Sequence, residues 1–215
     1  MAEELFAQAS EAAESAAPLA RRMAPRSLDE VAGQQQLLGP GKPLRRAIEA
    51  GRLGSAIFYG PPGTGKTALA TLAARWNAAR MVEVNAVSAG VAELRKLLEA
   101  ARYDLSQGRK TLLLVDEIHH FNRSQQDVLL PSVEKGEVTL VGLTTENPGF
   151  YINAALLSRS TAYEFQPLSE EDLRAVLRRA LTDKERGLGN MAIVLEPDAE
   201  AHFLRHCGGD CRRLL

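Results

Sequence analysis

The sequence contains few cysteines and no excess of charge of either sign. Its two cysteines, Cys207 and Cys211, are too few and too close for a disulfide framework, which is typical of proteins in a reducing cytosol. The 26 basic and 27 acidic residues give a net charge of −1. Because this balance creates no global positive field, any contact with nucleic acid or an anionic membrane has to be local.

Long apolar runs are also missing. No stretch reaches the roughly 18 residues that a membrane helix needs, and the N-terminus lacks the pattern of a signal peptide. We therefore expect a soluble cytoplasmic protein without a membrane partner.

The composition that is present is that of an average globular protein, with 45% apolar and 25% charged residues among 215. This length allows one substantial core and a smaller second domain. Residues 1–17 are rich in Ala and Glu and bury little, so we expect a mobile tail. We expect an α/β core over 18–166 and a helical lid domain over 167–215.

Strand and helix patterns alternate through the expected core, which favours a parallel sheet covered by helices on both faces. Beyond residue 166 the pattern becomes helical, beginning with a Ser-x-x-Asp capping signature at 169–172. The predicted strands are 55–60, 80–87, 110–118 and 138–145, and the predicted helices are 42–53, 66–77, 91–107, 124–136, 169–187 and 196–215, the last broken at Gly208–Gly209.

The segment "GPPGTGKT" at 60–67 matches the phosphate-loop pattern and lies between a predicted strand and a predicted helix. Its glycines allow backbone N–H groups to surround phosphate oxygens at a helix N-terminus. Lys66 is then placed for the β- and γ-phosphates and Thr67 for Mg²⁺. The predicted nucleotide-binding residues of this loop are Gly60, Pro61, Pro62, Gly63, Thr64, Gly65, Lys66 and Thr67.

A second acidic strand end follows at "TLLLVDEI", which delivers Asp116 and Glu117 to the carboxyl edge of the sheet. We expect Asp116 to hold Mg²⁺ and Glu117 to polarise the water that attacks the γ-phosphate. A transition-metal site with His119 and His120 is the alternative. Adjacent side chains diverge, so both imidazoles rarely reach one ion, and this alternative is the weaker one.

A zinc site in the C-terminal segment is a second alternative use of histidines. His202 and His206 have the i, i+4 spacing of one helix face, and Cys207 and Cys211 add sulfur ligands. The Gly208–Gly209 break interrupts that geometry, so we do not favour zinc.

Four segments in order, "GPPGTGKT", "LLLVDEIHHFNRSQQD", "GLTTENPGF" and "ALLSRS", resemble the AAA+ ATPases of the clamp-loader branch. The stretches "HFNRSQQD" and "TTENP" are most similar to the replication-associated recombination protein A family, and the resemblance covers about 18–215. It implies a P-loop NTPase fold of the AAA+ type, Mg-dependent ATP hydrolysis, a homo-oligomer with a tetramer expected, and DNA as a partner. Nucleoid association and single-strand-binding protein as a further partner also follow from it.

The resemblance also assigns roles to single residues. Thr145 matches the sensor-1 position at the γ-phosphate, with Asn147 close by, and Arg159 matches the arginine finger that reaches a neighbouring subunit's ATP. Taken without the family, Arg159 is equally typical of a surface cation.

Two further matches lie outside the central segments. Arg212 matches the sensor-2 arginine, and Val31 and Ala32 match the segment that packs against adenine. By themselves, Arg212 and its neighbour Arg213 are also typical of a solvated helix face.

The sequence departs from the family at Ala24 and His120, where a basic residue is usual, and after Arg159, where "ST" replaces basic or aromatic residues. These changes remove no nucleotide contact, but they weaken the expectation for DNA or inter-subunit contacts. The family continues beyond the position matching Leu215 with the rest of the lid and a tetramerisation region, so we expect a fragment.

Taken together, the motifs predict an ATPase that remodels DNA or DNA-bound protein at stalled or gapped replication forks. The ATPase part rests on the residues and the DNA part on the resemblance. Two alternatives stay open: an AAA+ ATPase or clamp-loader-like subunit that remodels protein away from forks, and an ATP-gated scaffold without turnover.

Overall fold

The computed structural model describes residues 17–215, which group by their contacts into two compact units. The sheet unit comprises residues 34–166, and the helical unit comprises 17–33 together with 167–215. The unit boundary after Gln166 coincides with the position where the sequence pattern becomes helical. Residues 17–33 group with the helical unit rather than with the sheet unit. Residues 1–16 of the predicted tail lie outside the described part.

The sheet unit is built on five parallel strands in the order β2-β3-β4-β1-β5. Strand β4 therefore lies between the strand that precedes the phosphate loop and the strand that precedes the acidic pair. The strands are β1 (Ala56–Tyr59), β2 (Arg80–Asn85), β3 (Thr111–Asp116), β4 (Thr139–Thr144) and β5 (Thr161–Glu164).

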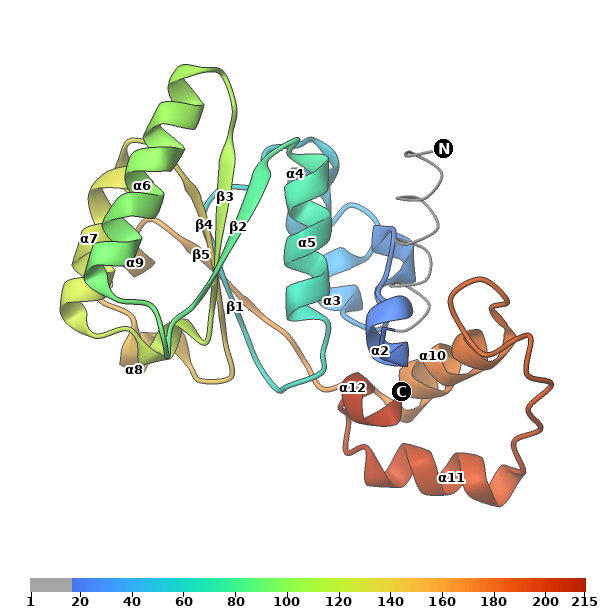
Figure 1. The fold of residues 1–215 in the computed structure, drawn as a ribbon. Helices are drawn as coiled ribbons and strands as arrows, with labels where there is room; N and C mark the ends of the chain where they lie inside the picture. Colours follow the sequence, from blue (N-terminus) through green and yellow to red (C-terminus); the bar gives the residue numbers. More distant parts are fainter. Residues whose placement is uncertain (1–16) are drawn as a thin grey trace. The chain divides into compact units, whose positions relative to one another are not determined.

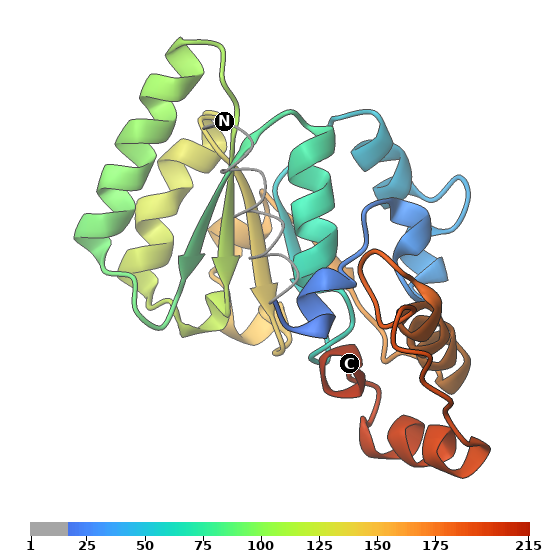
Figure 2. The same ribbon diagram turned by 45° about the vertical axis from the view of Figure 1, so that its right-hand side comes forward.

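Helices cover both faces of this sheet, as Figures 1 and 2 show, with α6 and α7 on one face and α5 with α4 on the other. Parallel strands need such crossovers, and the strands that are covered on both sides become almost wholly apolar. Residues Leu112 to Val115 of β3 are accordingly at most 2% exposed. The helices of this unit are α3 (Gln35–Leu38), α4 (Pro43–Glu49), α5 (Lys66–Trp76), α6 (Val91–Ser106), η2 (Ile118–His120), α7 (Arg123–Glu134), α8 (Pro148–Tyr151) and α9 (Ala154–Leu157).

The predicted α/β fold with a parallel sheet flanked by helices is confirmed. Strand β5 was not predicted, because its segment "TAYE" is an edge strand with mostly exposed side chains and carries no apolar run. The predicted helix 42–53 is too long. It ends at Glu49 because the chain turns at Gly51, whose φ of 62° is left-handed.

The helical unit has its own small core, formed by Leu168, Leu173, Leu177, Leu204, Cys207 and Leu214. The predicted cap of its main helix is present, since the Ser169 Oγ accepts the Asp172 N–H and the Asp172 carboxylate accepts the Ser169 N–H. The elements of this unit are α2 (Leu19–Arg22), η1 (Leu28–Glu30), α10 (Glu170–Thr182), α11 (Pro197–His206) and α12 (Cys211–Leu214).

The predicted helix 169–187 is also too long, because α10 ends at Thr182 and the chain folds back over its last turn. The Leu188 N–H donates to the Ala180 carbonyl at 2.7 Å. The predicted break at Gly208–Gly209 is confirmed, with φ values of 59° and 85°. Among the described residues, 17–215, no helix combines the length and the apolar character needed to cross a membrane.

Candidate nucleotide site

The phosphate loop connects the end of β1 to the start of α5. Gly60, Gly63 and Gly65 have φ values of 135°, 68° and 95°, which L side chains rarely adopt. Helix α5 begins at Lys66, and its N-cap Gly65 supplies no side-chain hydrogen bond. The N-terminus of this helix therefore offers backbone N–H groups and its partial positive charge to an anion.

Gly60 is required by packing as well as by conformation. A Cβ at this position would lie 2.1 Å from the Phe165 carbonyl oxygen. The Gly60 N–H donates to the Thr144 carbonyl at 3.2 Å, so the first residue of the loop is joined to the end of β4. Burial raises the pKa of the preceding Tyr59, and the nearby Glu164 raises it further.

The ammonium group of Lys66 folds back onto the loop. Lys66 is 9% exposed, and its Nζ donates to the carbonyl oxygens of Gly60 and Pro61, both at 2.7 Å. The Thr64 hydroxyl donates to the same Pro61 carbonyl at 2.9 Å. A buried ammonium at the centre of this loop fits phosphate oxygens, with which it can form charge-assisted hydrogen bonds.

The acidic pair ends strand β3 at the same edge of the sheet. Asp116 pairs in register with Asn85 of β2, and its carbonyl accepts the Ala86 N–H at 3.0 Å. Strands β3 and β1 are separated by β4, so their ends are roughly 10 Å apart. That span suits a phosphate chain with a cation between the loop and the carboxylates, so the residues present fit Mg-nucleotide.

Glu117 has the most unusual conformation at this edge. Its backbone is left-handed, with φ 51° and ψ 47°, and its buried Oε2 has no hydrogen-bond partner. Oε2 lies 3.3 Å from His119 Nδ1, within ion-pair range but without hydrogen-bond geometry. A strained backbone and an unsatisfied carboxylate oxygen cost stability, and such features concentrate at functional sites.

His119 lies between the ends of β3 and β4. Its Nδ1 is 2.9 Å from the Thr144 Oγ1, and that oxygen also accepts the Glu146 N–H at 2.9 Å. The imidazole packs against the ring of His120 at 4.1 Å and the edge of Tyr151 at 5.7 Å. Sequence reasoning considered His119 as a metal ligand and did not consider Thr144, because the contact between them joins residues 25 positions apart.

The residues assigned through the resemblance are found in three different environments. Thr145 is exposed directly after β4, and Asn147 caps α8 by accepting the Gly149 N–H. Arg159 is 40% exposed, with its Nη2 2.6 Å from the Glu134 Oε1 of the same chain. None of these contacts tests the sensor or finger roles, which stay predictions.

Val31, Ala32 and Arg212 belong to the helical unit, and their predicted roles at the nucleotide also stay predictions. In the same unit His202 and His206 stack at 3.9 Å, while the Cys207 thiol donates to the Leu204 carbonyl. Within residues 17–215 no three or more His, Cys, Asp or Glu side chains gather in a way that could hold a metal ion.

Gln34 is a structural support of the loop that sequence reasoning missed. It is 4% exposed, and its side chain bonds both the N–H and the carbonyl of Gln166, with a longer contact of 3.5 Å to the Thr64 carbonyl. The only signal is a run of three glutamines, which does not distinguish the buried member from the others.

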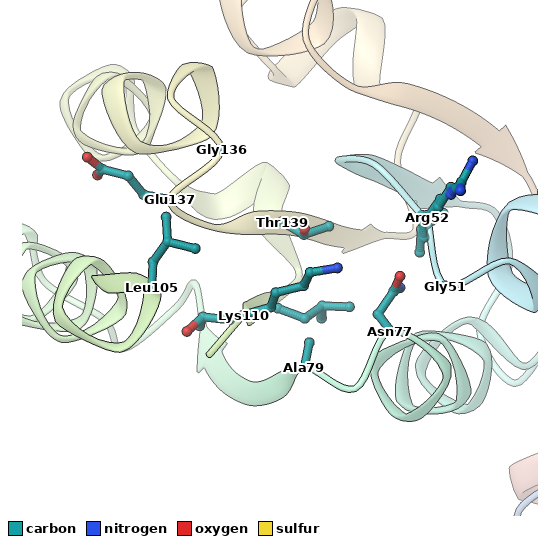
Figure 3. A pocket seen from close by; sticks show the side chains of 12 residues that line it. Gly51, Arg52, Asn77, Ala79, Leu105, Lys110, Gly136, Glu137 and Thr139 are labelled. Carbon is teal, nitrogen blue, oxygen red and sulfur yellow. The ribbon is translucent and has the colours of Figure 1, made fainter. Parts of the chain in front are cut away.

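A cavity of about 260 Å³ lies at the opposite, amino-terminal edge of the sheet and contains none of the predicted nucleotide residues. Figure 3 shows Lys110, Asn77 and Arg52 around it, with Glu137 at its far side. Its volume is below the roughly 300–1,000 Å³ of small-molecule pockets. A nucleotide at the phosphate loop does not need such a cavity, because its phosphates would be contacted by backbone N–H groups and side chains along the sheet edge.

Comparison with known proteins agrees with the motifs. The family described as "ATPase family associated with various cellular activities (AAA)" matches residues 56–168. The chain is 50% identical over 198 residues to replication-associated recombination protein A of Escherichia coli K12, covering 92% of this chain and 44% of that protein. It is 38% identical to the ATPase WRNIP1 of Dictyostelium discoideum, covering 92% and 22% respectively.

The fold has solved counterparts as well. The Thermotoga maritima RuvB Holliday junction branch migration motor has a TM-score of 0.70 and 24% identity, covering 90% of this chain and 63% of that one. The expected resemblance and the expected fold are thus confirmed. The chain spans less than half the length of the curated relatives that it matches.

Proposed function

This chain belongs to the AAA family of ATPases, and we propose that it binds ATP with Mg²⁺ and hydrolyses it to ADP and phosphate. The observation that carries the proposal is one sheet edge with two complementary halves. One half is a loop of left-handed glycines around a buried ammonium, and the other is a carboxylate with an unsatisfied oxygen.

Each residue then has a distinct task. The loop N–H groups and Lys66 hold the β- and γ-phosphates, and Thr145 with Asn147 contacts the γ-phosphate or the attacking water. The Thr67 hydroxyl and the Asp116 carboxylate would hold Mg²⁺, which when bound neutralises phosphate charge. Glu117 accepts a proton from the water as it attacks, a role for which a carboxylate free of arginine partners is suited.

Arg159 completes the site of a neighbouring subunit. Both side chains of its ion pair with Glu134 are exposed, and such pairs contribute only about 0–1 kcal/mol. Replacing Glu134 by a phosphate as the partner of Arg159 therefore costs little stability. Val31 and Ala32 pack against adenine and Arg212 acts as the second sensor. The assembly is a homo-oligomer, with a tetramer expected from the family.

The work done by hydrolysis is remodelling of DNA or DNA-bound protein at stalled or gapped forks, in the cytoplasm at the nucleoid. Support comes from relatives named for replication-associated recombination and from a fold shared with a Holliday junction motor. Single-strand-binding protein is a further proposed partner. The near-zero net charge restricts DNA contact to a local surface.

A subunit-mixing experiment on the natural full-length protein tests the proposal. Arg159→Ala and Glu117→Gln should each lower turnover by about 100-fold or more while retaining ATP binding. A 1:1 mixture should recover about one quarter of wild-type turnover, since an Arg159→Ala site next to a Glu117→Gln subunit regains both groups in a closed ring. No recovery on mixing would contradict a finger supplied by the neighbour.

The same assay separates the functions when single-stranded or gapped DNA is added. Stimulation of the wild-type ATPase by DNA is expected. ATP turnover that no DNA changes would instead favour the protein-remodelling alternative, and ATP binding without turnover would favour the ATP-gated scaffold.

A further inference from the structure

One neighbouring side chain, His119, approaches the Glu117 carboxylate. The imidazole is 13% exposed, and its Nδ1 faces two oxygen atoms at once, the Thr144 Oγ1 at 2.9 Å and the Glu117 Oε2 at 3.3 Å. Nδ1 has a single site for a proton or a lone pair, so it cannot satisfy both oxygens equally well.

The orientation of the Thr144 hydroxyl proton determines which of the two oxygens His119 Nδ1 can bond. The Oγ1 already accepts the Glu146 N–H at 2.9 Å, and its own proton has two acceptors, His119 Nδ1 at 2.9 Å and the Glu146 carbonyl at 3.5 Å. When Thr144 donates to Nδ1, that nitrogen presents no proton to the Glu117 carboxylate. When Nδ1 carries the proton, it donates to Thr144 and offers Glu117 a second, longer contact.

These contacts continue to the phosphate loop. The backbone carbonyl of Thr144 accepts the Gly60 N–H, and Thr145, the proposed sensor of the γ-phosphate, follows directly. A shift of the β4 end would therefore change the hydrogen bond to His119, and with it the approach of Nδ1 to Glu117. The connection runs through named atoms: Gly60 N, Thr144 O and Oγ1, His119 Nδ1 and Glu117 Oε2.

We propose that His119 is a positioning residue that holds the Glu117 carboxylate and couples its orientation to the end of β4. The inference rests on the proposed function, in which Glu117 activates the water. In this role His119 acts through Glu117 rather than directly on the nucleotide or the water. Its ring is held in place by His120 and Tyr151, which leaves the Nδ1 edge toward the two oxygens.

The test compares His119→Leu with His119→Asn, because the asparagine amide can supply a donor close to the position of Nδ1. His119→Leu should lower kcat about 10- to 100-fold, the range expected for a misplaced catalytic group, with ATP affinity unchanged. His119→Asn should recover most of the lost kcat. His120→Phe, which keeps a ring against His119, is the matched control and should retain wild-type kcat.

A double variant distinguishes coupling between Thr144 and His119 from general destabilisation of the fold. Thr144→Val keeps the shape but removes the hydroxyl, and it should lower kcat as His119→Leu does. Combining the two should give little further loss, because both act through one contact. The proposal would be overturned if the losses in kcat of the two single variants multiplied in the double variant. It would also be overturned if His119→Leu and His119→Asn lost the same amount of kcat and the same amount of melting temperature as each other.

The outcome is separable from the proposed function. If wild type hydrolyses ATP and Glu117→Gln does not, while His119→Leu retains full kcat, the positioning role is wrong and the ATPase assignment stands. If Glu117→Gln retains turnover, the assignment of Glu117 itself is wrong.

Discussion

The two edges of the same sheet treat their acidic residues in opposite ways. At the amino-terminal edge, Asp104 is 5% exposed and its carboxylate pairs with Arg80 at 2.8 Å and Arg109 at 2.5 Å. At the carboxyl-terminal edge, Glu117 has a strained backbone and an oxygen without a hydrogen bond. Arginines satisfy Asp104 at the first edge, whereas the Glu117 Oε2 at the second has only the His119 imidazole nearby, at 3.3 Å.

Glu137 repeats the pattern of the amino-terminal edge. Arg102 binds both of its oxygens, at 3.0 and 3.1 Å, and the Ser132 hydroxyl donates to it at 2.8 Å. Hydrogen bonds from Arg102 and Ser132 hold the pKa of Glu137 below its usual value, and Arg109 and Arg80 do the same for Asp104. A carboxylate held in this way is a poor proton acceptor, so the amino-terminal edge contributes stability and the carboxyl-terminal edge is the one suited to proton transfer.

The largest effect is expected at the carboxyl-terminal edge. Glu117→Gln should lower ATP turnover by about 10²–10⁴, the contribution of a general base, without lowering the melting temperature. Stability should hold because the change removes a charge from an unsatisfied buried oxygen. Turnover and thermal unfolding measured on one preparation check both parts, and a clear loss of stability would contradict the comparison.

A smaller effect of the opposite kind is expected at the amino-terminal edge. Glu137→Gln should destabilise the fold by about 1 kcal/mol, since it weakens charge-assisted bonds to a half-exposed Arg102. In a chain of this size that is a fall of about 2–4 °C in melting temperature. ATP turnover below the melting range should not change. Glu83→Gln, exposed on β2, is the matched control and should leave both quantities unaltered.

The smallest effect is the pH dependence of the Asp104 contacts. Because the folded-state pKa is lowered from 3.8, the stabilisation is complete above that value and is lost as the pH falls through the folded-state pKa. The difference in urea midpoint between wild type and Asp104→Asn should stay constant from neutral pH to about pH 5 and shrink below pH 4. A difference that keeps its size down to pH 3 would show that charge is not its source.

Much of the fold could be predicted because its signals are local. The apolar run of β3 and the phosphate-loop spacing are patterns that the chain carries in single short segments. Strand β5 was missed for the opposite reason: its place in the sheet depends on pairing with β1 rather than on its own composition. The ends of α4 and α10 depended on turns that follow them, which propensity alone does not locate.

The candidate site divides in the same way. The sequence by itself determined the glycines, Lys66, Thr67, Asp116 and Glu117, because residue type and spacing dictate what a phosphate loop and an acidic strand end offer. Only the tertiary structure brought Thr144 to His119 and left one Glu117 carboxylate oxygen unsatisfied. The strand order puts β4 between β1 and β3, and contacts between neighbouring strand ends have no trace in the sequence of any one strand.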